Sequence, residues 1–291
     1  MPKVNYTQKD QTIEINTVKR VHGWQYRRLD NHFFRSFIFI VIFMAFSLIV
    51  TATGNILWRG TVELANSLRS PEIWFAIRLS FLTAFISTLL CLGFAVPIAY
   101  GLERLRFRGQ HLASIIFDIP MALPPIVSGF ALLLLFGTTE FGHMLAEHGL
   151  KFVFTVNGII MAQFFVNLPY LIRILRSTIA DINPRFEFVA RTLGCSQWQA
   201  FTRIILPLAK NGLLAGLVTT WARALGEFGA ALMLAGATRM KTEVLPISLY
   251  LNLATGDLDL AMATATILIS FSLISLLIFE YLGRRPVTIS R

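Results

Sequence analysis

Residues 183–207 read NPRFEFVARTLGCSQWQAFTRIILP, a segment of mixed polarity that lies between long apolar runs. Asn183 and Pro184 are typical of a helix start, with Asn as the cap and Pro in the first turn. Gly194 permits a sharp turn of the backbone. A second short helix is therefore expected over 196–205, and the segment is predicted to be a protruding helix–turn–helix, either a plain surface connector or a docking element for another protein.

Six apolar segments surround this loop. About 20 apolar residues suffice to cross a hydrocarbon core of about 30 Å. The candidate spans are 33–57, 75–102, 112–137, 153–172, 212–235 and 260–282. Only 14% of the 291 residues are charged and 55% are hydrophobic, whereas soluble domains carry about 25% charged residues. The composition excludes a soluble enzyme, a disordered chain and a nucleic-acid-binding domain, and predicts an all-α polytopic membrane protein with six transmembrane helices.

The basic residues predict the orientation of these spans. Nineteen of the 26 Lys and Arg residues lie in 1–35, 103–111, 173–210 and the end of the chain from 283, and five lie in the alternate loops. Because basic residues collect in cytoplasmic loops, both termini are expected in the cytoplasm. The predicted parts are a cytoplasmic extension (1–32) that anchors at the lipid surface, a membrane domain (33–282) with a cytoplasmic loop (173–211), and a cytoplasmic tail (283–291).

The sequence shows no constellation that is suited to catalysis. It contains no GxxxxGK[ST] phosphate-binding motif, so any nucleotide chemistry is expected on another chain. His143, Glu147 and His148 are read as solvated loop residues rather than metal ligands, and Cys91 and Cys195 as incidental. We therefore expect no catalytic residue, cofactor or metal on this chain.

Two charged residues interrupt the fifth span. Arg223 and Glu227 are four residues apart, so they share one helix face and are able to pair. A charge at mid-membrane costs about 2.5–3.5 kcal/mol, so such residues normally face a protein interior or a watery path. Two compatible interpretations follow: an ion pair that locks the span against its neighbours, or an arginine that helps an anion through while the glutamate moderates its field.

The third span begins with a run of prolines. Pro120, Pro124 and Pro125 are predicted to break its helix, leaving backbone groups that protein or a water-lined cavity must satisfy. Asp118 is expected to cap the broken helix or to bind a basic partner. A more specific hypothesis is that the break is a hinge that changes conformation during transport. Hydroxyl groups that could donate to an oxyanion, or bond only their own helix backbone, belong to Ser128, Thr219 and Thr220.

The cytoplasmic loop resembles the EAA signature of ABC importer permeases. The match consists of FVARTLG at 188–194, nine intervening residues, and IILP at 204–207. The sequence departs from the signature at its start, where Phe188 stands in place of the family's Glu and Glu187 lies one position early. In that family the loop is the coupling helix in a cleft of the ATPase subunit. The resemblance implies ATPase-coupling roles for Phe188, Ala190, Gly194 and Pro207.

Three further stretches, at 118–129, 223–230 and 241–244, resemble permeases for tetrahedral oxyanions. The run 232–259 is more similar to the molybdate/tungstate branch than to the sulfate branch. The resemblance implies a type I ABC importer permease in a prokaryotic plasma membrane, with a translocation path or gate built from Asp118, Pro124, Pro125, Ser128, Thr219, Thr220, Arg223 and Glu227. It implies that an external solute-binding protein docks at Lys241, Thr242 and Glu243.

The implied assembly contains two copies of this chain and two ATP-binding subunits, which would hold ATP and Mg²⁺. Nucleic acid is not an expected partner. Within the family, a sulfate/thiosulfate permease is the closest alternative. An ion-coupled secondary carrier, with Asp118 and the Arg223–Glu227 pair as a relay, is the rival from another class. A carrier would have no use for a docking helix with this spacing.

Overall fold

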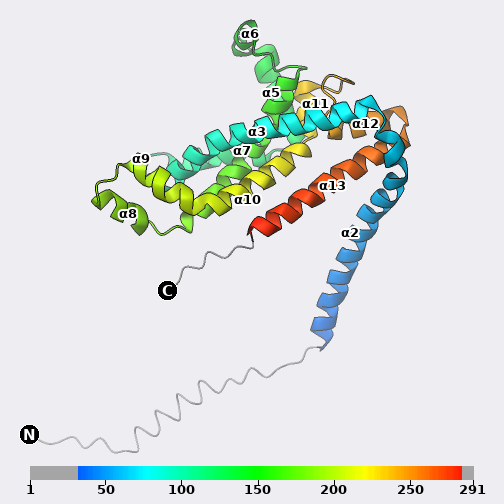
Figure 1. The fold of residues 1–291 in the computed structure, drawn as a ribbon. Helices are drawn as coiled ribbons and strands as arrows, with labels where there is room; N and C mark the ends of the chain where they lie inside the picture. Colours follow the sequence, from blue (N-terminus) through cyan, green and yellow to red (C-terminus); the bar gives the residue numbers. More distant parts are fainter. Residues whose placement is uncertain (1–31, 284–291) are drawn as a thin grey trace, which may run out of the picture. The chain divides into compact units, whose positions relative to one another are not determined.

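The computed structural model describes residues 32–283, which contain helices and no strand. The predicted extension and tail lie almost wholly outside these residues. The chain divides into two compact units between Thr53 and Gly54, and this division falls inside the first described helix (Figure 1). The helices are α2 (His32–Ser67), α3 (Pro71–Arg104), α4 (Gln110–Ala122), α5 (Pro125–Thr138), α6 (Glu140–Glu147), α7 (Val156–Ala180), α8 (Arg185–Thr192), α9 (Gln197–Ala200), α10 (Leu206–Leu225), α11 (Gly229–Ala235), α12 (Leu245–Thr255) and α13 (Leu258–Gly283).

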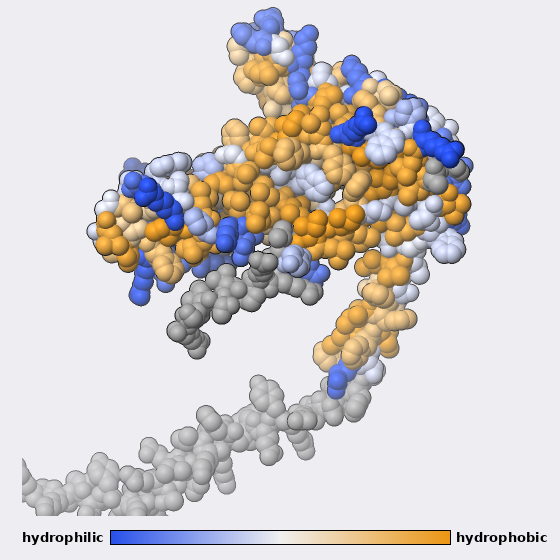
Figure 2. Space-filling model, in the orientation of Figure 1, coloured by the Kyte–Doolittle hydropathy of each residue, from blue (hydrophilic) through white to orange (hydrophobic). Residues whose placement is uncertain are grey.

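The helices confirm the predicted fold class. Five helical segments are long and apolar enough to cross a membrane, and a sixth span is formed if the bent pair α4 and α5 counts as one. Figure 2 shows the consequence at the surface, where hydrophobic residues cover much of the helical bundle. Such a surface suits lipid on the outside of the protein.

The third span is broken as its prolines predicted, although only two of the three cause the break. α4 and α5 meet at 109°, and Leu123 and Pro124 between them are both extended, with ψ of 143° and 136°. Each of these two residues precedes a proline, and a following proline disfavours the helical conformation. Pro120 lies inside α4 and does not end it.

The fifth span differs from its prediction at both ends. A continuous helical segment runs over Gln197–Leu225, so the predicted short helix over 196–205 is not separate. A π-helical turn at Phe201–Ile205 joins α9 to α10, which accommodates Pro207 because proline has no N–H and its ring clashes with a helical carbonyl. At the other end the helix stops at Leu225, and α11 begins only at Gly229.

The core of the larger unit lies between α3, α7 and α10, which run side by side (Figure 1). Two glycines let α10 approach α7 closely. A Cβ at Gly216 would lie 2.9 Å from Leu171 Cδ1, and one at Gly212 would lie 2.3 Å from Thr178 Oγ1. The GxxxG pattern at 212–216 therefore packs two helices of the same chain together.

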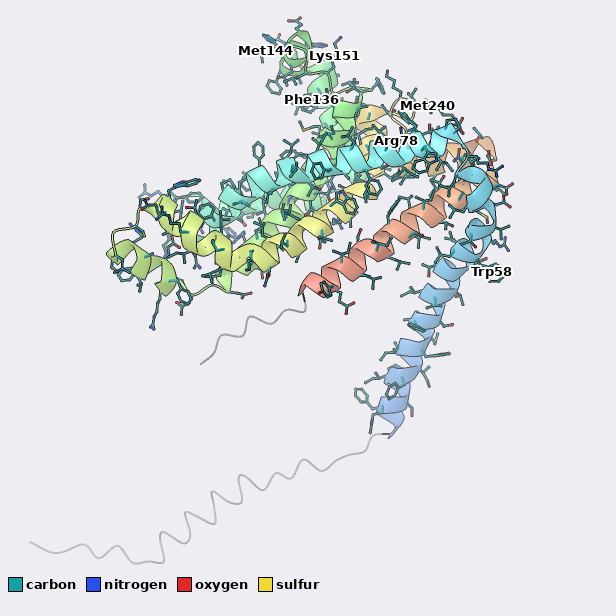
Figure 3. The ribbon with its side chains drawn as sticks, in the orientation of Figure 1. Trp58, Arg78, Phe136, Met144, Lys151 and Met240 are labelled. Carbon is teal, nitrogen blue, oxygen red and sulfur yellow. The ribbon has the colours of Figure 1, made fainter. Side chains whose placement is uncertain are left out.

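A separate arm is formed by α5 and α6. α5 packs on α11, and a Cβ at Gly129 would lie 2.6 Å from the backbone of Ala230. Beyond α5, the short helix α6 stands away from the bundle, and Figure 3 shows Met144 of α6 and Lys151, which follows the helix, at the far end of the arm. His148 of this arm bonds the carbonyl oxygen of Met144 through Nδ1 at 2.8 Å.

Candidate functional site

The loop at 183–207 folds as the predicted helix–turn–helix. The side chain of Asn183 accepts a hydrogen bond from the Arg185 backbone N–H at 3.0 Å, just before α8. Gly194 ends the turn with φ of 92°, in the region that favours glycine. Ser196 and Gln199 then form a capping box at the start of α9. Local capping and one left-handed glycine thus determine this turn.

The inner face of α8 is tied to the ends of two long helices. The Glu187 carboxylate accepts a hydrogen bond from the Tyr100 hydroxyl group and lies 3.8 Å from Arg104 Nε. The Arg104 guanidinium also donates to the carbonyl oxygens of Ile179, at 2.9 Å, and Ile182. The side chains of Glu187 and Arg104 are 12% and 11% exposed. The carboxylate one position early in the motif therefore anchors α8 to α3 and to the end of α7.

The outer face of α8 and α9 is apolar and largely exposed, and the only ring contact there among residues 32–283 is that of Trp198 with Phe201. Its exposed large side chains are Phe186, Phe188, Val189, Leu193 and Trp198. A groove of about 400 Å³ is lined by Phe188, Arg191, Thr192, Cys195, Ser196 and Gln197. Large apolar side chains gathered on a polar helix indicate a protein-interaction surface.

The four predicted coupling residues do not share this surface. Phe188 and Gly194 are exposed on it. The Ala190 side chain is buried, at 5% exposure, so the prediction that it contacts a partner is wrong: it packs inside the loop itself. Pro207 lies in the first turn of α10, after the π-helical turn. Sequence reasoning missed Tyr100 and Arg104, for which the displaced Glu187 was the available signal.

Arg223 and Glu227 are not arranged as the predicted helical pair, because α10 ends between them at Leu225. The Arg223 guanidinium lies over the ring of Tyr170, with its carbon 3.6 Å from the centroid, and its side chain is exposed on the single chain. Glu227 is buried, and its carboxylate accepts a hydrogen bond from Ala230 N at 2.9 Å. The arginine therefore makes a cation–π contact, while the glutamate caps α11.

The other predicted path residues have separate surroundings. Asp118 does not cap the broken helix; it pairs with Arg173 of α7 at 3.2 Å, as the alternative of a basic partner predicted. The Thr219 hydroxyl group bonds its own backbone at Ala215. Ser128 and Thr220 are fully buried, and their hydroxyl groups have no hydrogen-bond partner among the described residues. Pro124 and Pro125 are exposed at the bend between α4 and α5.

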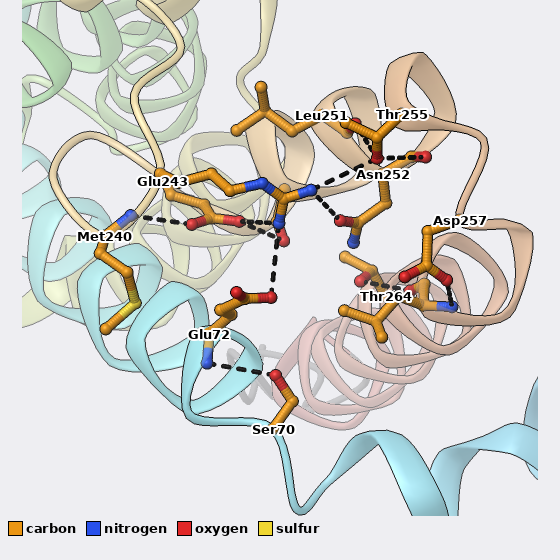
Figure 4. A network of polar contacts seen from close by, with 12 residues as sticks. Ser70, Glu72, Met240, Glu243, Leu251, Asn252, Thr255, Asp257 and Thr264 are labelled. Carbon is orange, nitrogen blue, oxygen red and sulfur yellow. Dashed lines mark hydrogen bonds and ion pairs between the residues drawn. The ribbon is translucent and has the colours of Figure 1, made fainter.

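Two of the three predicted docking residues are buried, and Figure 4 shows one of them, Glu243, inside a network of polar contacts. Glu243 is fully buried, and its carboxylate accepts hydrogen bonds from Met240 N at 2.9 Å and Ser248 Oγ at 3.0 Å. Arg239 lies 3.7 Å from this carboxylate. It also reaches residues of α3 and α12, namely Glu72, Asn252 and Thr255.

Thr242 is also fully buried, donating to Gly236 O and accepting from Thr238 N, each at 3.1 Å. The docking prediction is therefore wrong for the side chains of Thr242 and Glu243, which hold the turn instead. Lys241 remains exposed, beside Met240, whose backbone adopts a positive φ of 56°. Figure 3 shows Met240 at the surface of this turn.

The family model described as a binding-protein-dependent transport system inner membrane component matches residues 92–287. The sulfate transport system permease protein CysT of Escherichia coli is 31% identical over 256 residues, which cover 86% of this chain and 91% of that protein. The molybdenum transport system permease protein ModB of Haemophilus influenzae is 37% identical over 213 residues, covering 72% and 93%.

Solved structures share the fold. The bacterial alginate ABC transporter, in complex with an alginate pentasaccharide-bound periplasmic protein, contains a chain that matches with a TM-score of 0.69 at 18% identity, covering 89% of this chain and 98% of that one. The MetNI methionine ABC transporter in an inward-facing conformation matches with a TM-score of 0.55 at 16% identity, covering 74% and 99%. The chain belongs to the family of binding-protein-dependent transport system inner membrane components, the permease subunits of ABC importers.

Proposed function

We propose that this permease carries tetrahedral oxyanions, with molybdate or tungstate as the physiological cargo and sulfate or thiosulfate as the alternative. The curated relatives support this class because their names divide between the two groups. All of these anions share a tetrahedral shape and a double negative charge. The chemistry that this chain must supply is therefore the passage of a dianion through a membrane.

The observation that carries this proposal is the exposed Arg223 guanidinium over Tyr170. Tyr170 lies within α7, ten residues before the end of the helix at Ala180, and inside the predicted fourth span at 153–172. A charge that lies beside a transmembrane span normally faces water or another protein surface rather than lipid. An arginine that faces a watery path without a carboxylate partner attracts anions and repels cations.

Glu227 is turned away from the proposed anion position. Its carboxylate accepts a hydrogen bond from the N-terminus of α11, which leaves the hydrogen-bond donors of Arg223 available to an anion in the path. The ring of Tyr170 lowers the guanidinium's need for water without supplying a competing anion. Weak binding suits this position, because a permease must release its cargo.

The coupling loop supports an assembly with two ATP-binding subunits, on which ATP and Mg²⁺ would be bound and hydrolysed. The exposed apolar surface of α8 and α9 would fill a groove on each ATPase. Glu187 would transmit the movement of α8 to α3 through Tyr100 and Arg104. This chain itself would carry out no covalent chemistry.

On the opposite side, we assign delivery to an extracytoplasmic binding protein. The turn held by Arg239 and Glu243 presents Lys241 and Met240 at its surface, and this pair is the candidate contact. The assignment places both termini in the cytoplasm of a prokaryotic plasma membrane, with two copies of the chain around one path. The distribution of Lys and Arg supports that orientation.

The test is uptake of labelled tungstate by proteoliposomes that contain the complete transporter, with excess molybdate or sulfate and with an ATPase-dead control. We expect ATP-dependent uptake that molybdate blocks and sulfate does not. Block by sulfate would transfer the chain to the sulfate branch. Uptake that persists with the dead ATPase would replace the proposal with an ion-coupled carrier.

A single substitution tests the proposed role of Arg223. Arg223→Ala is expected to lower uptake about tenfold or more, the equivalent of one charged hydrogen bond to the anion, while the complex still assembles. Loss of the assembled complex would instead assign Arg223 a structural role.

A further inference from the structure

Arg173 of α7 is a second exposed arginine near Tyr170. It lies seven residues before the end of the helix at Ala180, or about 10 Å along the axis. Its side chain is 61% exposed on the single chain. The predicted fourth span ended at residue 172, so this arginine was counted as a loop residue; the structure places it inside the helix.

Arg173 and Tyr170 lie on the same face of α7. Residues three apart on a helix are neighbours on its surface, and their axial separation is about 4.5 Å. Since the Arg223 guanidinium rests on the Tyr170 ring, the two arginines follow one another along this face. An anion that leaves Arg223 toward the cytoplasmic end of α7 meets Arg173 next.

The partner of Arg173 is an exposed carboxylate rather than a fixed structural group. Asp118 of α4 lies 3.2 Å from the guanidinium, and its own side chain is 38% exposed. An exposed pair of this kind is weak and exchanges with other ions. The next arginine, Arg176, is held differently, because it donates to Ser114 Oγ at 2.6 Å and lies 3.7 Å from Glu103.

A small pocket adjoins the pair. It has a volume of about 60 Å³ and is lined by Leu102, Ser114, Phe117, Asp118, Ile172, Arg173 and Arg176. The pocket leaves open space beside the Asp118 side chain, although Ala113 and Phe117 of α4 pack against the core near α7. Because Asp118 lines this space and is 38% exposed, its carboxylate is able to move away from Arg173 when another anion takes its place.

We propose that Arg173 is the second anion-binding position of the path, and that Asp118 competes with the transported oxyanion for its guanidinium. The planar fork of arginine donates two parallel hydrogen bonds to an oxyanion as it does to a carboxylate. Asp118 accepts one hydrogen bond from Nη2 of the Arg173 guanidinium; it holds this position when the path is empty and displaces the anion toward the cytoplasm. This inference rests on the proposed function and adds a residue and an order of events to it.

The proposed competition predicts that two substitutions change the affinity for the oxyanion in opposite directions. In nanodiscs that hold the complete transporter without its binding protein, Arg173→Gln is expected to weaken equilibrium binding of labelled tungstate about tenfold, and Asp118→Asn to tighten it about threefold. In proteoliposomes with the binding protein, Arg173→Gln lowers ATP-driven uptake about tenfold. Arg173→Lys keeps the positive charge and loses the planar fork, so its uptake should fall between that of the wild type and that of Arg173→Gln.

The outcomes separate this inference from its alternatives. Wild-type uptake in Arg173→Gln, or equal losses in Arg173→Gln and Asp118→Asn, would overturn it and leave the pair as a structural contact. Arg69→Gln removes an exposed arginine outside the predicted spans and serves as the matched charge control, and the yield of assembled complex reports misfolding. If the wild-type transporter neither binds nor moves any tetrahedral oxyanion, the proposed function itself fails.

Discussion

Replacing Glu187 should uncouple ATP hydrolysis from transport. In the structure its carboxylate has two partners, the Tyr100 hydroxyl group and the Arg104 guanidinium, and the pair with Arg104 is nearly buried. Breaking a buried pair usually costs 3–5 kcal/mol. Arg104 keeps two backbone acceptors, at Ile179 and Ile182, so about 2 kcal/mol is the better figure for Glu187→Ala. That energy favours detached states of α8 by about 30-fold.

The assay is the number of ATP molecules hydrolysed per anion moved in proteoliposomes. Glu187→Ala should raise this ratio most. Tyr100→Phe removes one hydrogen bond of about 1 kcal/mol. Its effect on the ratio of ATP hydrolysed to anion moved should therefore be about fivefold smaller than that of Glu187→Ala. Arg185→Gln removes a charge from the exposed side of the same helix and is the matched control. An unchanged ratio in Glu187→Ala, with normal assembly, would show that α8 does not act through α3.

Three further predictions concern backbone geometry and packing. Gly194→Asp places a side chain at a φ of 92°, so we expect the turn to lose about 1–2 kcal/mol of stability. Less ATPase should then co-purify with the permease. Unchanged docking and uptake would refute the coupling assignment. Gly216→Ala brings a Cβ to 2.9 Å from Leu171 and should lower the unfolding midpoint by the equivalent of about 1–3 kcal/mol, whereas Gly93→Ala, with nothing within 4 Å, should not. Glu227→Ala removes the cap of α11 and should cost about 1 kcal/mol; in a thermal-unfolding cycle with Arg223→Ala the two effects should add, and a coupling above about 0.5 kcal/mol would contradict the separate roles.

The break in the third span was predictable because its cause is local. Pro124 and Pro125 constrain the residues before them whatever surrounds them. The turn at Gly194 was predictable for the same reason. Both features depend on the conformational range of one or two residues, which the sequence states directly.

The end of α10 was not predictable in this way. Apart from Glu227, the residues from Leu225 through Ala235 are apolar or glycine, and Gly226 is equally compatible with a helix interior and a helix end. The structure resolves the ambiguity through Glu227, whose carboxylate caps α11. Hydropathy alone therefore gave the pair Arg223 and Glu227 a shared helix that they do not have.

The remaining differences between the sequence predictions and the structure arise from side-chain burial and from the length of a helix. Ala190, Thr242 and Glu243 stand in motifs whose family resemblance implied contact with partners, yet their side chains point into the chain. The resemblance identified segments, whereas the direction of each side chain depends on packing between elements far apart in sequence. Arg173 was missed because the apolar run ends at residue 172 while the helix continues to Ala180.

The π-helical turn has a mechanical consequence. Because α9, this turn and α10 form one segment of 29 residues over Gln197–Leu225, the segment is a rod about 43 Å long. Trp198, which is exposed on the proposed docking surface, lies at one end, and Arg223 lies at the other. If an ATPase moves the end of the rod that carries Trp198, the whole rod is expected to be displaced, and the proposed anion-binding charge of Arg223 would move with it.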